Sequence, residues 1–489
     1  MKPLVLALCA AVAAATPAAA QIAPAQPAGA AHWRALTELD LEAAYALVRD
    51  NHPGAVPEVG DDAFRAGLDR AIAEGRARAA RVDSYAGYAA TLNAFAVALG
   101  DKHIWSRQAL RPAIYYWPSL VVARRGGTWQ VADDSREGAA PSLVGARLIG
   151  CDGRSADELG AERLGTYRAV WSIEAQRVQT APYLLVDDGN PFLTRPKACE
   201  FEAGGVRSTV TLNWSRIGPV SLTPHVAKAI NGGAAGFGVR RFAGGYWIAL
   251  ESLDDSARAV VDAVKAQATD LRAAPMVVLD LRGNGGGASS YGDEIAQALM
   301  GARYVRQVQD NAGANACAAA WRATPGNLEG LRAFRRDNGA NLDPDTRNYL
   351  ESTERGLDAA IKAGKAFDTP VRACPGADRP ERAPADGRGS LLTGRMVILT
   401  DASCFSSCLL VVQQFRRLGA LHVGDATDAA TRYMEVREAL LPSGISYAST
   451  LQKVAMAAPA RIGPFLPARP YEGDIGDTAA LEAWVAGLR

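Results

Sequence analysis

Apolar residues recur every three to four positions in the first part of the chain, with polar residues between them. The pattern covers Asp40–Asn51, Asp61–Ala80 and Ser84–Leu99. This spacing gathers the apolar side chains on one face of a helix. We therefore expect a small helical domain over residues 39–109.

The pattern changes to short apolar runs from residue 110 to residue 215. Runs such as SLVVA, TWQVA and STVTLNW are separated by Gly and Asp turns. Short runs of β-branched residues between turn signals are typical of strands. The segment is predicted to be a β-rich module.

From residue 216 to residue 489 strand-like and helix-like segments alternate. The apolar runs YWIALESL, MVVLDL and RMVILT are each followed by a stretch with helical periodicity. Such alternation is typical of a layered α/β domain with a largely parallel sheet. A polar stretch rich in Arg and Asp, residues 311–388, interrupts the pattern and is expected to form an inserted cap.

Length and charge narrow the classes of function. The chain has 489 residues, more than one hydrophobic core usually organises, so two or three domains are expected. Lys plus Arg number 53 against 52 for Asp plus Glu. This near balance gives no field that favours nucleic acid or an anionic membrane surface as a partner.

The N-terminal stretch has the features of a secretory signal. Lys2 precedes an apolar run, and small residues at Ala18 and Ala20 precede Gln21. This order matches a signal peptide over residues 1–20 with cleavage before Gln21. The run is too short to span a bilayer, and no later stretch reaches the roughly 18 apolar residues of a membrane helix. We expect an exported protein, periplasmic or secreted, whose residues 21–38 form a flexible leader.

Cysteine usage fits export. Six of the seven cysteines follow the predicted signal peptide. An even number in an oxidising compartment favours disulfides, and the absence of a CxxC pair argues against a metal site. Positions four apart across a helix start lie about 6 Å apart at Cα, within reach of a disulfide. We expect Cys404–Cys408, with Cys151–Cys199 and Cys317–Cys374 as the favoured other pairs.

A glycine cluster follows the buried run at residues 276–281. In MVVLDLRGNGGGASS, Gly283, Gly285 and Ala288 fit the spacing of a dinucleotide-binding fingerprint. Backbone N–H groups freed by glycine suit an oxyanion equally well. A ribose-binding acid is expected about 20 residues later at a strand end. Asp310 lies too late and Gln307 is not acidic, so the oxidoreductase hypothesis is the weaker one.

A serine-rich turn follows the later run RMVILT. In LTDASCFSSCLL a serine either caps the following helix or exposes its hydroxyl oxygen at the positive end of that helix. The carboxyl ends of parallel strands meet at one edge of a sheet, where active sites of such sheets form. We therefore expect the serine turn and the glycine cluster to face one another, which places a nucleophile beside an anion-binding backbone.

Together these segments resemble a known family, the tail-specific or C-terminal processing serine proteases, in the branch of the tricorn core and retinoid-binding-protein-like relatives. The resemblance rests on VVLDLRGNGGG, LTDASCFSSC, HVGDAT, ALGDKHIW and LPSG. It implies a ClpP/crotonase-like layered α/β catalytic domain with an N-terminal helical domain and a PDZ-like module, to which the stretch GARLIGCDG at residues 145–153 is similar. It also implies a serine peptidase that cleaves polypeptides and needs no metal or organic cofactor.

The resemblance assigns roles position by position. Ser406 takes the place of the nucleophile and His103, in GDKHIW, that of the base. The tail-specific branch uses a lysine instead, but the corresponding stretch TDAATRYMEV has none, and Lys453 is wrongly spaced. The oxyanion hole is expected from the backbone N–H groups of Gly286 and Ser407, with Gly285 or Gly287 as alternatives to Gly286.

Two departures from the family pattern leave the third catalytic residue open. Lys102 stands where the family has an orienting serine, and the stretch APARIG, where a late acidic residue is expected, has none. Glu435 and Asp428 are the candidates for the third residue. Because of these departures, the alternative function is a catalytically silent protein on the same fold that binds a ligand or a peptide.

Overall fold

The computed structural model describes residues 29–110, 112, 114–138, 141–230, 235–311, 319–340, 342–372 and 384–488. The expected signal peptide lies outside these residues, as do Cys317 and Cys374 of the expected third disulfide. Within the described ranges, no helix is long and apolar enough to cross a membrane.

The N-terminal helical domain consists of α1 (Ala30–Asn51), α2 (Asp62–Ala79) and α3 (Tyr85–Ala98), with short turns η1 (Pro53–Ala55) and η2 (Pro57–Val59). The three predicted helices are confirmed. Asp61 and Ser84 cap α2 and α3 by accepting hydrogen bonds from backbone N–H groups of the first turn. The helix α1 begins at Ala30, so much of the expected leader is helical. Its early start is held by Trp33, whose ring packs against Tyr85 and Tyr88 of α3.

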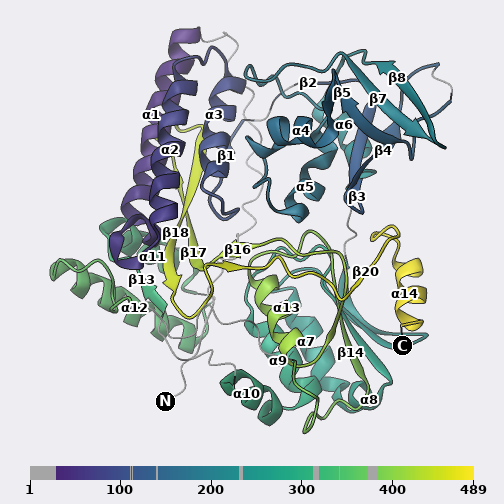
Figure 1. The fold of residues 1–489 in the computed structure, drawn as a ribbon. Coiled ribbons are helices and arrows are strands. Elements are labelled where there is room, and N and C mark those ends of the chain that lie inside the picture. Colours follow the sequence, from purple (N-terminus) through teal and green to yellow (C-terminus); the bar gives the residue numbers. More distant parts are fainter. Residues whose placement is uncertain are drawn as a thin grey trace.

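A four-stranded sheet lies against these helices and joins distant parts of the chain. It contains β1 (Ser106–Gln108), β13 (Ala319–Trp321), β17 (Tyr433–Leu440) and β18 (Ser446–Ala455). The strand β18 pairs with the other three, all antiparallel. Figure 1 shows this C-terminal hairpin alongside α1 and α3. The turn between α3 and β1 is therefore held close to the C-terminal part of the chain.

The predicted β-rich module has a six-stranded sheet and several short helices. The sheet contains β3 (Leu120–Arg125), β4 (Thr128–Asp134), β5 (Arg147–Cys151), β6 (Arg154–Ser155), β7 (Ala198–Ala203) and β8 (Val206–Thr211). Around it lie α4 (Ala156–Gly160), η3 (Ala161–Gly165), α5 (Glu174–Thr180), η4 (Ala181–Tyr183), α6 (Pro219–Ala227) and the pair β2 (Tyr115–Trp117) and β9 (Ser215–Ile217). The disulfide Cys151–Cys199 joins the paired strands β5 and β7, as expected.

The α/β domain is built on a second six-stranded sheet, in the order β10-β11-β12-β14-β15-β20. The strands are β10 (Phe237–Phe242), β11 (Gly245–Leu250), β12 (Met276–Asp280), β14 (Arg395–Thr400), β15 (Leu421–Gly424) and β20 (Arg469–Pro470). All neighbours pair in parallel except β10 and β11. A small pair, β16 (Ala430–Thr431) and β19 (Arg461–Ile462), lies beside it.

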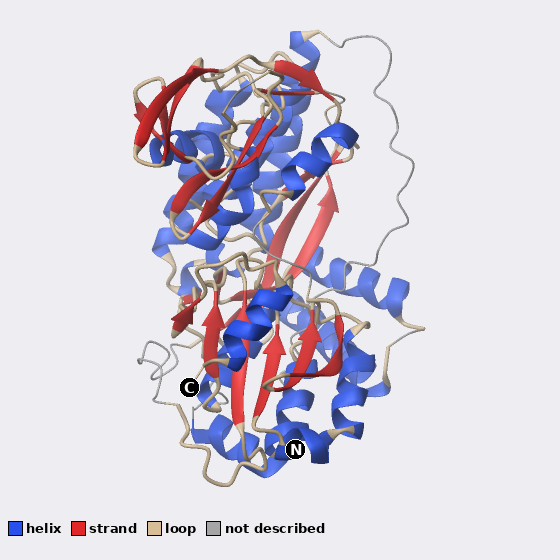
Figure 2. Cartoon of the chain, turned by 90° about the vertical axis from the view of Figure 1, so that its right-hand side faces the viewer, coloured by secondary structure: helices blue, strands red, loops and turns tan. Residues whose placement is uncertain are grey.

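Helices cover both faces of this sheet, so the predicted layered α/β architecture is confirmed (Figure 2). The helices are α7 (Ala257–Ala266), α8 (Ala268–Ala273), α9 (Ser290–Met300), α10 (Ala302–Asn311), α13 (Ser407–Arg417) and α14 (Thr478–Ala486). The core on one face lies under α7, α9 and α13, and α14 closes the other face. The loops after β12 and β14 emerge at the same edge of the sheet because these strands are parallel neighbours.

The described part of the insertion contains β13 and two packed helices, α11 (Pro325–Asn338) and α12 (Pro344–Lys362). Thr324 and Asn327 bond to Asn51 at the end of α1, at 2.8 and 3.0 Å. In Figure 1 both helices lie beside the lower end of α1, apart from α13. The described residues of this insertion thus extend the sheet of β18 and pack against the end of α1.

Candidate active site

Ser406 stands at the turn from β14 into α13. It is the residue before the first turn of α13, and its backbone has φ 56° and ψ −126°. A residue other than glycine held in such a conformation costs of order 1–3 kcal/mol, and such residues cluster at functional sites. The Ser406 side chain is partly exposed at the positive end of α13.

A disulfide closes this turn. Cys404 and Cys408 are bonded, with their Cα atoms 5.4 Å apart, and both residues are fully buried. This is the pairing that the spacing predicts. The bridge ties the residue two before Ser406 to the first turn of α13, so it restrains the strained backbone at Ser406.

We predict that removing the Cys404–Cys408 disulfide slows the reaction of Ser406, although the short loop means that it costs little stability. The Cys404→Ser/Cys408→Ser variant should lose about 2 kcal/mol of stability, because the closed loop is short, and should react more slowly with a serine-directed fluorophosphonate. The control variant Cys151→Ser/Cys199→Ser opens a bridge with a sequence separation of 48. It should lose more stability, about 4 kcal/mol, yet keep the reaction rate. Denaturant unfolding and labelling kinetics measure the two effects, and equal labelling rates in both variants would show that the turn does not depend on its bridge.

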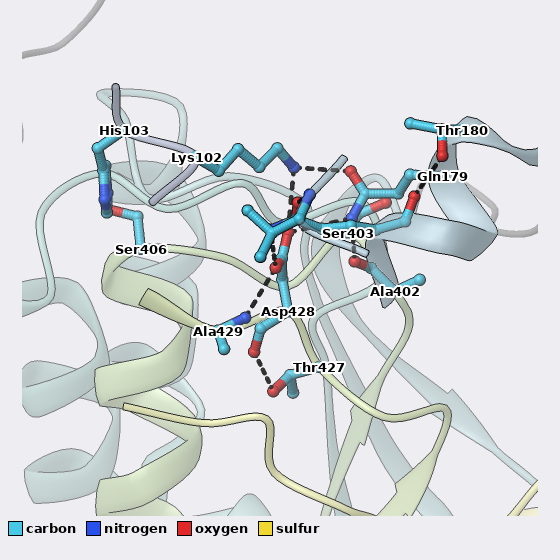
Figure 3. A network of polar contacts seen from close by, with 12 residues as sticks. Lys102, His103, Gln179, Thr180, Ala402, Ser403, Ser406, Thr427, Asp428 and Ala429 are labelled. Atoms are coloured by element: carbon cyan, nitrogen blue, oxygen red, sulfur yellow. Dashed lines mark hydrogen bonds and ion pairs between the residues drawn. The ribbon is translucent and has the colours of Figure 1, made fainter. Parts of the chain in front are cut away.

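His103 lies next to Ser406 although the two are far apart in the sequence. Its Nε2 atom is 3.0 Å from the Ser406 hydroxyl oxygen. The turn between α3 and β1 carries His103, and the sheet of β1 and β18 holds that turn against the α/β domain. Figure 3 shows the imidazole ring and the hydroxyl facing each other. Sequence reasoning named both residues, and the fold brings them together.

The other ring nitrogen of His103 faces Asp101. Nδ1 is 2.8 Å from Asp101 Oδ1, which also accepts the backbone N–H of His103 at 2.8 Å. The second carboxyl oxygen accepts hydrogen bonds from the backbone N–H and the hydroxyl of Thr431. Asp101 is almost fully buried. The acid paired with His103 is therefore Asp101, which we did not propose from the sequence.

The hydrogen bonds of Asp101 decide its charge. Burial acts to raise the pKa of Asp101, but the charge of His103 and hydrogen bonds from His103 and Thr431 outweigh burial, so the pKa lies below its ordinary value. Asp101 is thus ionised at neutral pH, and its Oδ1 atom can only accept a hydrogen bond from Nδ1 of His103. In the neutral ring Nδ1 then carries the hydrogen, and Nε2 offers its lone pair to the hydroxyl of Ser406.

The glycine cluster lies against the serine turn, as its position after β12 predicts. A Cβ atom on Gly286, whose φ is +109°, would lie 2.8 Å from Cβ of Ser406 and 3.1 Å from the backbone N of Ser407. Only glycine therefore fits at this position. The N–H of Gly286 donates to Oδ1 of Asn284 at 2.9 Å, so the donor expected for an oxyanion already has a partner.

Two buried polar residues fasten the glycine cluster to the serine turn. The backbone oxygen of Asn284 accepts the N–H of Phe405 at 3.2 Å. The Asp401 carboxylate accepts the N–H groups of Gly283 and Ser403, at 3.1 and 2.9 Å. Burial raises the pKa of Asp401 to about 7. Sequence reasoning missed both residues, because neither Asn284 nor Asp401 stands out from the turn residues around it.

The two acids expected as third members lie elsewhere. Asp428 is fully buried and accepts hydrogen bonds from Gln176 and Lys102, at 2.8 and 3.2 Å. In Figure 3 its carboxylate belongs to the network of Lys102, separate from the pair of His103 and Ser406. Glu435 lies on β17, with a carboxyl oxygen 3.9 Å from Nζ of Lys453. In place of either, the structure puts Asp101 beside His103.

The described residues contain no group of three or more His, Cys, Asp or Glu side chains that could hold a metal ion. What they bring together is a serine on a helix N-terminus, a histidine within hydrogen-bond distance and a buried acid behind it. That arrangement and fold are those of a serine peptidase.

A comparison of sequences identifies the domain that carries Ser406. Residues 245–458 match the model described as peptidase family S41, a range that runs from β11 past β18 and includes Ser406. The chain therefore contains a peptidase family S41 domain. No curated protein matches the chain.

Solved structures share the fold over nearly the whole chain. The crystal structure of mature CPAF is 13% identical, with 94% of this chain and 97% of that chain covered at a TM-score of 0.58. The structure of mature CPAF complexed with lactacystin is 13% identical, with 93% and 98% covered at a TM-score of 0.56. At this identity the match concerns the fold alone, and it includes the helical domain and the β-rich module.

Proposed function

We propose that the protein is an exported peptidase that cleaves polypeptides through an acyl-enzyme on Ser406, with His103 as general base. The observation that carries the proposal is the 3.0 Å contact between Nε2 of His103 and the hydroxyl oxygen of Ser406, at the start of α13 in the S41 domain. Export is supported by the predicted signal peptide and by the two disulfides.

The geometry supports an acyl-transfer sequence. Nε2 of His103 takes the proton as the oxygen of Ser406 attacks the peptide carbonyl carbon, which gives a tetrahedral intermediate. The imidazolium then gives that proton to the leaving amine as the peptide C–N bond breaks. Water repeats the cycle on the acyl-enzyme and releases the acid product. The ionised Asp101 holds the ring by Nδ1 and stabilises the imidazolium in both halves.

The oxyanion of the intermediate needs backbone N–H donors beside Ser406. The amide of Ser407 belongs to the first turn of α13, whose dipole also favours negative charge there. We propose the glycine cluster as the source of the second donor. Because the N–H of Gly286 is bonded to Asn284, substrate either displaces that hydrogen bond or uses the neighbouring amide of Gly287.

A direct test of Asp101 is the Asp101→Asn variant. Asparagine keeps the size of the side chain but has no negative charge to stabilise the imidazolium. We therefore expect kcat/KM to fall at least on the order of 10²-fold, the lower end of what general acid–base catalysis contributes. Asp133→Asn serves as the comparison, because Asp133 is also a buried acid bonded to a histidine, His225, within the β-rich module. If Asp133→Asn loses as much as Asp101→Asn by the same peptidase assay, the loss in Asp101→Asn does not come from the acid behind His103.

The Ser–Lys mechanism of the tail-specific branch makes an opposite prediction about Lys453. Nζ of Lys453 is 2.9 Å from the hydroxyl of Tyr349 on α12, within the insertion. An amine held there has no role at Ser406, so Lys453→Ala should change kcat/KM by less than about twofold. Loss of turnover in Lys453→Ala, measured beside the wild type at one pH, would restore a lysine base.

The substrate class is tested with peptides that differ only at the C-terminus. The family resemblance and the β-rich module support unstructured or C-terminal segments as substrates, so casein and peptides with a free C-terminal carboxylate should be cleaved. Amidated versions of the same peptides should be cleaved more slowly. If neither casein nor any peptide is cleaved and Ser406 also resists a fluorophosphonate, the fold serves as the silent binding protein named above as the alternative.

A further inference from the structure

Lys102 lies immediately before His103 and reaches away from Ser406. Its Nζ atom donates to Oε1 of Gln179 at 2.7 Å and to Oδ2 of Asp428 at 3.2 Å. Figure 3 shows the side chain extended toward Gln179, on the side opposite to the hydroxyl of Ser406. Lys102 is therefore placed to act on the site through its neighbours and not as the base.

The buried side chain of Asp428 forms an ion pair with Lys102. Its side chain is 0% exposed, whereas that of its partner Lys102 is 40% exposed. Hydrogen bonds from Gln176 and from the backbone N–H of Ala429, both at 2.8 Å, satisfy one carboxyl oxygen. A buried charge is strongly destabilising when its ionic partner is removed. The ion pair with Lys102 thus fixes Lys102, and with it the turn that carries His103.

This ion pair also binds the β-rich module to the serine turn. Gln176 and Gln179 both belong to α5 of that module. Nε2 of Gln179 donates to the backbone oxygen of Ala402 at 2.6 Å, four residues before Ser406. Ile173 and Ala175 pack in one apolar cluster with Ala402 and Ala429. The module, the His103 turn and the Ser406 turn therefore meet at a single set of contacts.

Phe405 extends these contacts to the reacting pair. Nζ of Lys102 is 5.0 Å from the centre of the Phe405 ring, and the centre of the His103 ring is 4.4 Å from it. An ammonium at this distance attracts the face of an aromatic ring. Phe405 directly precedes Ser406 and its ring contacts that of His103, so Lys102 touches a residue that adjoins both partners of the 3.0 Å contact.

We propose that Lys102 is a positioning residue: its ion pair with Asp428 locks α5 of the β-rich module onto the active site and holds His103 in line with Ser406. The proposal rests on the proposed function of that pair. It gives Asp428 a role other than the one expected from the sequence, and it makes the β-rich module part of the catalytic apparatus.

The test compares Lys102→Met with a matched lysine. Lys228 also pairs with a buried acid, Asp133, but lies within the β-rich module, so Lys228→Met is the control. Two readouts are used on the purified protein with all its domains. One is the rate at which a small fluorophosphonate labels Ser406, which needs no peptide-binding surface. The other is hydrogen exchange at the amides of His103 and Ile104, which are bonded to Asp101.

Lys102→Met should slow labelling on the order of tenfold, because small misplacements of a catalytic pair carry costs of this size or larger. It should also speed exchange at both amides, while Lys228→Met changes neither readout. Lys102→Arg keeps the charge and should label faster than Lys102→Met. Adding Asp428→Asn to Lys102→Met should cost less than the two single effects combined, since one interaction is removed.

Labelling and exchange in Lys102→Met equal to those in the wild type and in Lys228→Met would overturn the proposal. Additive effects in the double variant would overturn it as well.

The proposed function and the positioning role of Lys102 can fail separately. If Lys102→Met speeds exchange but the wild type is not labelled at Ser406, the proposed function fails. The positioning role of Lys102 in catalysis then fails with it, while the contact between the module and the His103 turn stands. If the wild type is labelled and Lys102→Met is not slowed, only the positioning role fails.

Discussion

Ser406→Ala should abolish peptidase activity, with kcat/KM reduced by about 10⁴-fold or more. Alanine has no oxygen to attack the peptide carbonyl, so no acyl-enzyme forms. The variant should fold normally, because alanine at φ 56° is no more strained than serine at that position. Initial rates on casein or a cleavable peptide measure the loss, and circular dichroism and the melting temperature confirm the fold.

The matched control for this variant is Ser403→Ala in the same turn. Ser403 contributes its backbone N–H to Asp401, which alanine retains. Activity close to that of the wild type is expected. If Ser406→Ala keeps substantial activity while a change elsewhere removes it, the nucleophile has been assigned to the wrong residue.

His103→Ala should lower kcat/KM by 10²-fold to 10⁴-fold, the range typical of general base catalysis. In this variant the Nε2 atom that accepts the proton of Ser406 is gone. The leaving amine also has no general acid to protonate it. The reduction should appear mainly in kcat, because His103 acts on the reacting atoms. Steady-state kinetics on one peptide, with wild type and variant at equal pH, measure the split.

His225→Ala provides the control for His103→Ala. The Nδ1 atom of His225 is 2.6 Å from the buried carboxylate of Asp133. This pair resembles that of His103 and Asp101 but belongs to the β-rich module and not to the site of Ser406. It should leave kcat nearly unchanged. Equal losses from the two histidine variants would mean that His103 matters for folding and not for proton transfer.

The sequence predicted the parts of the site that depend on local order along the chain. The serine turn and the glycine cluster each follow a buried run, and parallel pairing of β12 with β14 brings both to one edge. The Cys404–Cys408 bridge follows from a spacing of four across a helix start. These features depend on strand direction and helix geometry, which apolar periodicity reveals.

Asp101 was missed for a physical reason. Gly100 has φ +73°, which turns the chain so that the carboxylate of Asp101 bonds both to the backbone N–H and to the ring of His103. Aspartate side chains commonly bond to backbone two residues on. The stretch GDKH therefore contains the pattern that predicts the contact between Asp101 and His103. We expected a distant acid instead, because the family pattern places one late in the chain.

Tertiary packing decided what the sequence did not predict. The start of α1 depends on the ring contacts of Trp33 with α3, which a stretch rich in Ala and Pro does not reveal. The described part of the insertion packs beside the end of α1, because Asn51 accepts hydrogen bonds from Thr324 and Asn327 there. Contacts between segments so far apart in the sequence leave no periodic pattern in either one.

The central claim is that His103 activates Ser406, and one measurement tests it most directly. The purified protein is treated with a fluorophosphonate, and the labelled residue is located by peptide mass mapping in the wild type and in His103→Ala. The account predicts one adduct, on Ser406, formed on the order of 10²-fold more slowly in His103→Ala. An adduct on another residue, or labelling of Ser406 that is equally fast without His103, would contradict it.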